Sequence, residues 1–401
     1  MIRIMREKIT RDLQVLRLLD TETRFFEGLW SIPEGVSYNS YVLDTGEGLV
    51  VFDTWKNKYA NEYLETLCEV CDPRDISYIV VHHTEPDHSG ALPVVLRENS
   101  SIKVVGHTIT KGLINAFYKV SPEFIEVSDG YELVLGKYHL RFYTTPWLHW
   151  PDTIVSYLLE EKILFTCDIF GGYGVFDKLF VEDLDSDEYV EYLWYMKKYL
   201  ANIVGHYIEW VPKALDKISG LEVKVIAPAH GLLWRTPGKA IELYKLWSSG
   251  RGDRRKYVII YTSMYGFVEK ALEKIIDILA SSADEIRVFR FTDRVHDSIS
   301  DLLGEALDAT GLVIATSTYE ADIQPLGKYL VELIARKIRT PKLVLVIAAY
   351  GWGGVAGKKI KEILEKADHK IVDVIEFRSS LIDEKRLTKA LEEFLKYIVK
   401  S

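Results

Sequence analysis

The stretch HHTEPDHSG, residues 82–90, gathers three histidines, a glutamate and an aspartate within nine positions. The apolar run YIVV, residues 78–81, precedes it, and SGALPVVL, residues 89–96, overlaps its end. The first run predicts a buried strand and the second predicts a helix. Because functional groups in α/β folds often lie where a strand ends, the sequence predicts a site in this loop.

Three more ionisable residues follow apolar runs elsewhere in the chain. His149 lies in LRFYTTPWLHWPDT, Asp168 ends KILFTCD, and His230 ends VKVIAPAH. We expect these strand ends to converge on the loop at 82–90. His82 precedes His83 by one strand position and therefore points to the opposite face, so we interpret it as structural.

The remaining histidines and acids near strand ends receive no functional role. Asp53 in LVVFDTW and His107 in VVGHTIT end other strands, and we interpret both as structural. His206 in NIVGHYIEW is assigned no role.

Composition limits the class of protein. With 401 residues, 48% of them hydrophobic, the chain is long enough for two domains with sizeable cores. The net charge of -9 argues against a nucleic-acid partner, because nucleic-acid-binding proteins usually carry a basic face. Charges interrupt the apolar positions of the N-terminus, so we expect no signal peptide and no membrane span, and predict a cytoplasmic protein.

The chain has three cysteines, too few for a disulfide framework. Cys68 and Cys71 form a C-x-x-C pair, which could be redox-active, but a four-thiolate metal site needs a second such pair and the sequence has none. We favour two cysteines that are one helical turn apart and have no shared chemistry.

A basic, glycine-containing stretch, WSSGRGDRRK at 247–256, is the best linker candidate. We predict domains at 1–250 and 256–401. Short strand-like runs interspersed with helices indicate a layered α/β or α+β first domain. The second domain alternates continuous apolar runs with amphipathic helices, which predicts a five-stranded parallel sheet covered on both faces. Such sheets bind ligands at the carboxyl ends of their strands.

The ordered motifs HTEPDHSG, LHWPDT, TCD and PAHG resemble the diiron site of the flavodiiron proteins, also called A-type flavoproteins. The resemblance implies an α/β fold with an N-terminal metallo-β-lactamase-like αββα sandwich, followed by a five-stranded parallel, flavodoxin-like, doubly wound domain. It also implies two non-haem iron ions. By this resemblance His83, Glu85 and His149 would bind one iron, Asp87, His88 and His230 the other, and Asp168 would bridge them.

The carboxylate at Glu85 bears on the choice of metal. Hydrolytic relatives on the same fold carry a histidine there, and an imidazole-rich site suits zinc and hydroxide chemistry. A carboxylate makes the site harder and more anionic, which favours iron or manganese, and iron can change its oxidation state. The ligand set therefore points to redox work.

Three loops of the second domain resemble the phosphate and ring loops of flavodoxins, and the resemblance implies flavin mononucleotide (FMN). A hydroxyl-bearing turn that opens a helix can hold phosphate. The predicted phosphate residues are Thr262, Ser263, Met264, Tyr265, Gly266, Phe267 and Val268. The predicted ring residues are Ser317, Thr318, Tyr319, Glu320, Tyr350, Gly351, Trp352, Gly353 and Gly354. Val268 departs from the threonine of many such loops, so one phosphate hydrogen bond is expected to be missing.

The resemblance implies an oxidoreductase that reduces dioxygen to water, nitric oxide to nitrous oxide, or both. Electrons would come from a separate donor such as rubredoxin, a reduced deazaflavin or a nicotinamide-linked reductase. A head-to-tail homodimer, or a dimer of dimers, would bring one flavin to the partner's irons. Two alternatives stay open: a zinc hydrolase with a flavodoxin-like docking domain, and a non-enzymatic electron carrier or interaction module.

Overall fold

The computed structural model describes residues 2–252, 254–378 and 382–398. Asp253, within the predicted linker, and the two ends of the chain, residue 1 and residues 399–401, lie outside the described residues. The chain forms two compact units. The first comprises the chain up to Leu200 together with Glu209–Tyr244, and the second comprises Ala201–Ile208 and the chain from Lys245 onward.

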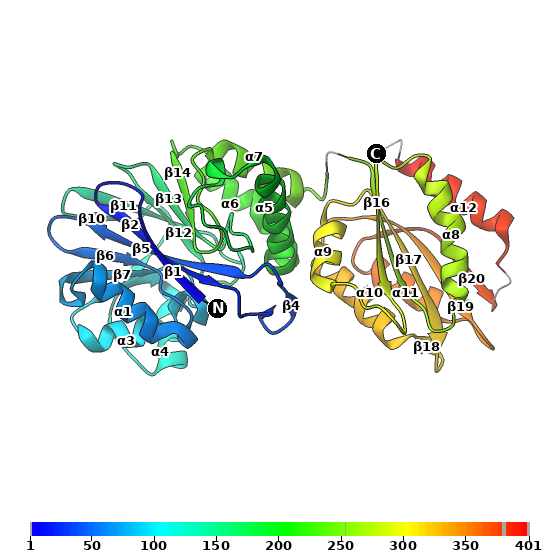
Figure 1. Cartoon of the computed structure of the whole chain (residues 1–401), viewed down its shortest axis with the longest axis horizontal. Helices are drawn as coiled ribbons and strands as arrows, with labels where there is room; N and C mark the ends of the chain where they lie inside the picture. Colours follow the sequence, from blue (N-terminus) through cyan, green and yellow to red (C-terminus); the bar gives the residue numbers. More distant parts are fainter. Residues whose placement is uncertain (1, 253, 379–381, 399–401) are drawn as a thin grey trace. The chain divides into compact units, whose positions relative to one another are not determined.

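Two β-sheets form the centre of the first unit (Figure 1). The first sheet has the order β1 (Ile2–Lys8), β2 (Leu13–Asp20), β5 (Val36–Asp44), β6 (Leu49–Phe52), β7 (Ile76–Val81), β8 (Lys103–His107) and β9 (Glu123–Val127). The second has the order β10 (Glu132–Leu135), β11 (Tyr138–Thr144), β12 (Ile154–Leu158), β13 (Ile163–Cys167) and β14 (Val225–Pro228). A short hairpin pairs β3 (Phe25–Phe26) with β4 (Trp30–Ser31).

Helices cover the outer faces of these two sheets (Figure 1). On the side of the first sheet are α1 (Ala60–Val70), α3 (Leu92–Glu98) and α4 (Thr108–Tyr118). On the side of the second are α5 (Ser186–Tyr199), α6 (Val211–Ile218) and α7 (Pro237–Ser248). The predicted αββα sandwich is confirmed.

The core of the first unit lies between its two sheets. Buried side chains from both sheets form one apolar cluster, and the rings of Phe52 on β6 and Phe165 on β13 stack with centroids 4.0 Å apart. Strands β6, β7 and β8 run parallel and are joined through α1 and α3, so β7 and β8 end at the same edge of the sheet. β13 and β14 also run parallel, so both sheets offer strand ends.

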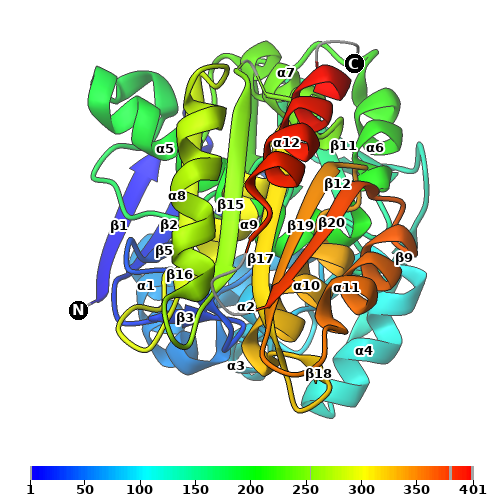
Figure 2. The same ribbon diagram turned by 90° about the vertical axis from the view of Figure 1, so that its right-hand side faces the viewer.

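The second unit is a parallel sheet with helices on both faces (Figure 2). The sheet order is β16 (Glu285–Phe291), β15 (Lys256–Thr262), β17 (Gly311–Tyr319), β19 (Leu343–Tyr350) and β20 (Lys370–Arg378). The helices are α8 (Phe267–Ala280), α9 (Ile299–Leu307), α10 (Pro325–Lys337), α11 (Ala356–Glu365) and α12 (Glu384–Ile398). The predicted five parallel strands are confirmed, in the doubly wound order that flavodoxins use.

The strand order explains which helices share a face. The connection through α8 runs from β15 to β16, opposite in direction to the connections through α9, α10 and α11. Because βαβ crossovers are right-handed, α8 lies on the other face, where it packs with α12 (Figure 2). A two-residue strand, β18 (Asp322–Ile323), was not predicted from the sequence and pairs antiparallel with β17. A strand of that length leaves no periodic pattern.

A buried charge cluster lies at the start of the second unit. The Lys256 ammonium group is 2.6 Å from the Glu305 carboxylate and forms a second ion pair with Asp308. All three residues are buried. Burial would lower the pKa of Lys256, but the charges of Asp308 and Glu305 outweigh it and raise this pKa. Lys256 therefore stays charged at the first position of β15.

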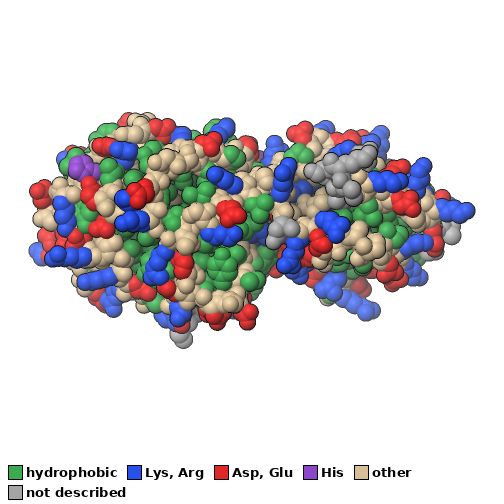
Figure 3. All heavy atoms as spheres, turned by 90° about the horizontal axis from the view of Figure 1, so that it is seen from above, with side chains coloured by type: hydrophobic (Ala, Val, Ile, Leu, Met, Phe, Trp, Pro, Cys, Tyr) green, Lys and Arg blue, Asp and Glu red, His purple; other side chains and the backbone are tan. Residues whose placement is uncertain are grey.

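The surface in Figure 3 carries lysine, arginine, aspartate and glutamate side chains interspersed over both units. No helix in the described part of the chain combines the length and the apolar character that a membrane crossing requires.

Candidate metal centre

The seven predicted metal ligands come from loops at the ends of strands. His83 and Glu85 follow β7, and Asp87 and His88 lie in the short helix α2 (Pro86–Ser89). His149 lies between β11 and β12, Asp168 follows β13 directly, and His230 follows β14. Six of the seven are buried and Glu85 is partly exposed. The predicted convergence of strand ends is therefore found in the fold.

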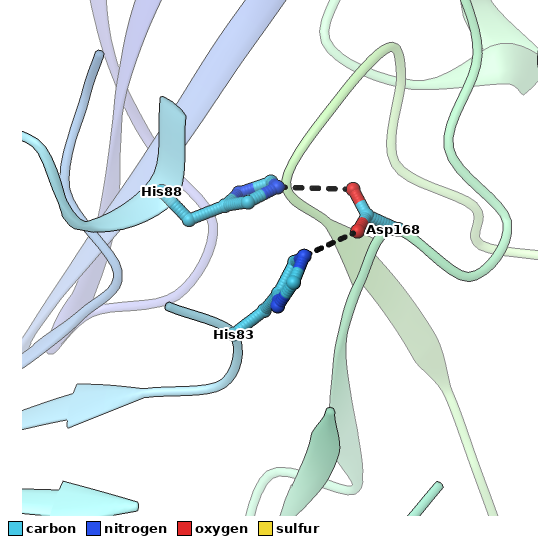
Figure 4. Close-up of side chains that lie close together, drawn as sticks. All are labelled: His83, His88 and Asp168. Carbon is cyan, nitrogen blue, oxygen red and sulfur yellow. Dashed lines mark ion pairs between the residues drawn. The ribbon is translucent and has the colours of Figure 1, made fainter. Parts of the chain in front are cut away.

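Asp168 lies at the centre of this group, and its two carboxylate oxygens face different histidines (Figure 4). Its Oδ1 atom is 3.0 Å from Nε2 of His88 and 3.5 Å from Nε2 of His230. Its Oδ2 atom is 3.8 Å from Nε2 of His83 and 3.7 Å from Nε2 of His149. Such a division is what a carboxylate that bridges two cations requires.

Each half of the group has its own terminal carboxylate. Oε2 of Glu85 is 2.8 Å from Nε2 of His149 and 3.2 Å from Nε2 of His83. His83, Glu85 and His149 have ligand atoms within 4.8 Å of one another, and so do Asp87, His88 and His230. The two sets are the ones that the resemblance implies, and His88 lies with the second set.

Polar atoms in the centre lack hydrogen bonds. Among the described residues, the buried atoms without a hydrogen-bond partner include Asp87 Oδ1, His88 Nε2, Asp168 Oδ2 and His230 Nε2. A buried polar atom left unsatisfied costs about 1–3 kcal/mol. A pair of cations would satisfy all four atoms, so the residues present fit the diiron group.

The electrostatics of the centre favour positive charge. Burial would lower the pKa of His83, but hydrogen bonds with Asp152 and Glu85 raise it to about 10. Burial likewise opposes the charge on His88, yet the carboxylates of Asp87 and Asp168 raise its pKa. Burial would raise the pKa of Asp168, but the neighbouring histidines hold it well below its usual range. Metal cations would take the place of the protons that these groups otherwise share.

Hydrogen bonds from outside the ligand set fix its orientation. Nδ1 of His83 is 3.2 Å from Oδ1 of Asp152, whose Oδ2 accepts from the backbone N–H of Thr84 at 2.9 Å. Nδ1 of His230 hydrogen-bonds to the Ser37 carbonyl at 2.7 Å. In both histidines Nε2 is thereby turned toward the centre.

Two residues with supporting roles at the centre, Asp152 and Tyr199, were not predicted from the sequence. Asp152 lies within the motif LHWPDT, where a carboxylate three positions after His149 could have been singled out. Tyr199, the last residue of α5, donates a hydrogen bond from its hydroxyl to Oδ1 of Asp168 at 2.7 Å. A tyrosine at the end of a helix carries no sequence signal for such a contact.

Replacing Asp152 tests its orienting role. We expect Asp152→Ala to weaken metal binding about 10- to 100-fold, because the His83 ring loses the partner that fixes it. Metal titration of the metal-free protein, followed by elemental analysis, measures the effect. The matched control is Asp177→Ala, an exposed carboxylate on the same unit, and metal affinity equal to the control would exclude this role for Asp152.

The residues that were interpreted as structural lie in other hydrogen bonds. His82 bonds through Nδ1 to Oδ2 of Asp53 at 2.8 Å and through Nε2 to Oγ of Ser156 at 2.7 Å. His107 accepts a hydrogen bond from the backbone N–H of Ile109 at the start of α4. Nδ1 of His206 bonds to the carbonyl of Arg336 at 2.9 Å, within the second unit.

The two thiols of the C-x-x-C motif lie at the C-terminal end of α1. Cys68 is exposed and Cys71, which caps the helix, is partly buried. Burial, followed by the charges of nearby acids, raises the pKa of Cys68, and burial raises the pKa of Cys71 to about 12.

In the second unit, the predicted flavin residues lie at the carboxyl ends of β15, β17 and β19 and in the segments that follow, and the parallel arrangement of these strands brings them to one edge of the sheet. Gly266, Gly351 and Gly353 have no atom within 4 Å of the place that a side chain would occupy. Tyr265 and Trp352 are more than four-fifths exposed beside them. Bare backbone and free aromatic faces at a strand-end edge fit a phosphate and a flat ring.

The side chains of two predicted phosphate residues make other contacts within the second unit. The Thr262 hydroxyl hydrogen-bonds to that of Thr316 at 2.6 Å, and both residues are buried. The Val268 side chain packs into the apolar core beneath α8. Only their backbone groups could serve a phosphate.

Comparisons with known proteins place the chain in a family. The family model described as "ODP family beta lactamase" matches residues 36–231. The chain is 31% identical to a nitric oxide reductase from Moorella thermoacetica, with 91% of this chain and 90% of that protein covered. It is 28% identical to a rubredoxin-oxygen oxidoreductase from Megalodesulfovibrio gigas, with 89% and 88% covered.

Solved structures agree with the sequence comparison. A flavo di-iron protein variant from Thermotoga maritima superimposes with a TM-score of 0.94 at 35% identity, with 99% of this chain and 100% of that chain covered. Both units are therefore matched in one relative, in the same order. The chain belongs to the flavodiiron protein family, as its histidine and carboxylate motifs predicted.

Proposed function

We propose that this chain is a flavodiiron oxidoreductase that reduces dioxygen to water, nitric oxide to nitrous oxide, or both. Its family relatives include proteins named nitric oxide reductase and rubredoxin-oxygen oxidoreductase. The observation that carries the proposal is the division of the Asp168 oxygens between two sets of histidines, each set with its own carboxylate. When bound, two iron ions and FMN supply the electrons for this reduction.

The side chains that would hold the two metals differ in their exposure to solvent. Glu85 is the partly exposed ligand, whereas Asp87 and His88 are buried. Aromatic rings enclose the centre: Phe26 and Tyr38 lie edge-on to His230, with centroids 5.6 Å and 5.3 Å away. Such aromatic packing limits the access of water to this side of the centre.

Glu85 favours iron over zinc in this proposal. A site with two terminal carboxylates, one bridging carboxylate and no thiolate is hard and anionic, which suits a redox-active cation better than an all-imidazole site does. The same carboxylate argues against a zinc hydrolase, the alternative that the family model's beta lactamase description would suggest.

FMN would bind in the second unit, with its phosphate on the loop of residues 262–268 and its ring between the loops after β17 and β19. We further propose a cytoplasmic homodimer, arranged head to tail, that receives electrons from a separate donor such as rubredoxin, a reduced deazaflavin or a nicotinamide-linked reductase.

Anaerobic reduction followed by stopped-flow mixing with each gas tests the proposal. We expect iron and FMN in the purified protein, and rapid flavin reoxidation with dioxygen, nitric oxide or both. The relative rates decide which gas is preferred. A protein that contains zinc, shows no flavin absorbance and hydrolyses an ester or amide would contradict the proposal and support the hydrolase.

A further inference from the structure

The phosphate loop of the second unit contains an acidic side chain. Glu269 lies in the first turn of α8, and its carboxylate accepts a hydrogen bond from the hydroxyl of Ser263. Ser263 in turn accepts a hydrogen bond from the backbone N–H of Gly266 at 3.3 Å. Glu269, Ser263 and Gly266 are thus linked across the loop that the proposed function assigns to the phosphate.

This contact engages the one predicted serine or threonine hydroxyl that remains for a phosphate. Thr262 bonds to Thr316, and Val268 has no hydroxyl and lies in the core. Ser263 is therefore the remaining aliphatic hydroxyl of the loop 262–268, which also carries the phenolic hydroxyl of the exposed Tyr265, and it donates to Glu269. A phosphate that uses Ser263 as a donor must displace this carboxylate.

The same carboxylate also interacts with the positive, N-terminal end of the α8 dipole. Gly266 precedes α8 with φ of 79°, and Glu269 is the third residue of the helix, where acids stabilise the dipole. A bound phosphate is attracted by the same end of the helix. Within the described residues, no lysine or arginine forms an ion pair with Glu269, so no such pair offsets its negative charge toward a second anion in the loop.

We propose that Glu269 sets the affinity and the selectivity of this chain for the flavin phosphate, by holding Ser263 and repelling the phosphate dianion. The inference rests on the proposed function, because it takes FMN as the ligand. As a consequence, the Kd for FMN is closer to the Kd for riboflavin, which lacks the phosphate, than it would be if the loop backbone acted without Glu269.

The test is flavin binding by the flavin-free protein, measured as quenching of flavin fluorescence. We expect Glu269→Gln to lower the Kd for FMN about tenfold, the size of one charge contact near a protein surface, and to leave the Kd for riboflavin unchanged. Glutamine keeps an acceptor for Ser263 while it removes the charge. Glu273→Gln, one turn further along α8 and exposed, is the matched control and should change neither Kd.

Glu269→Ala separates the charge from a new contact, since the glutamine amide could itself donate to the phosphate. The alanine variant should also tighten FMN binding, and thermal melting of the flavin-free variants verifies their fold. FMN affinity that stays equal or falls in both variants, or a gain that riboflavin shares, would overturn the inference. Absence of FMN binding by the wild-type protein would instead contradict the proposed function.

Discussion

Asp168→Asn should abolish the coupled metal pair: we expect bound iron to fall by about half or more and gas reduction to fall about 100-fold or more. An amide has one oxygen acceptor, so it cannot present one anionic oxygen to each cation. In the structure Oδ1 faces His88 and His230 while Oδ2 faces His83 and His149. Asparagine has nearly the same shape as aspartate, so the variant isolates the loss of charge and of the second oxygen.

Iron content and reduction rate, measured on the same preparation, verify this result. Asp177→Asn, on an exposed aspartate of the same unit, controls for the loss of one carboxylate and should retain both properties. Flavin content should stay normal in both variants, because the flavin loops belong to the other unit. Full iron content with unchanged activity in Asp168→Asn would remove Asp168 from the site.

Lys256→Met should destabilise the second unit by about 3 kcal/mol or more. The ammonium group of Lys256 is buried with Glu305 at 2.6 Å and is also paired with Asp308. Methionine fills a similar volume, so the variant leaves two carboxylates close together without the cation they share. Arg287, at 3.5 Å from Glu305, remains exposed and offers weaker compensation.

Denaturant unfolding of the flavin-free protein, followed by circular dichroism, measures the change. We expect the transition of the second unit to shift to lower denaturant while that of the first unit stays in place. Lys366→Met, on an exposed lysine of the same unit, is the control and should leave both transitions unchanged. A transition at the wild-type midpoint would show that Lys256 contributes little.

The sequence predicted the fold best where local pattern and global topology agree. The runs KYVIIYT and KLVLVIA are apolar between their terminal residues because β15 and β19 are covered on both faces, and this property can be read without coordinates. The segment Ala201–Ile208 belongs to the second unit although it precedes α6 of the first. Its placement depends on contacts such as that between His206 and Arg336, and no local sequence pattern predicts them.

The candidate site divides in the same way. The ligand loops could be predicted because strand ends and ionisable residue types are both visible in the sequence, whereas metal binding by these seven residues stays a prediction. Tyr199 and the engagement of Ser263 by Glu269 were not predictable, since they depend on where side chains meet in space. Val268 shows the limit of motif comparison. The sequence shows that valine replaces threonine at this position, but it does not show that the valine side chain packs into the core.

The protonation of the two thiols at the end of α1 affects how well the protein resists oxidation. Peroxide attacks the thiolate and not the protonated sulfur, and both Cys68 and Cys71 hold their protons more tightly than a free cysteine does. The negative end of the helix lies beside them and opposes ionisation further. A protein that encounters oxidants at every turnover thus carries its exposed cysteine in the protonated form, which oxidants attack more slowly than the thiolate.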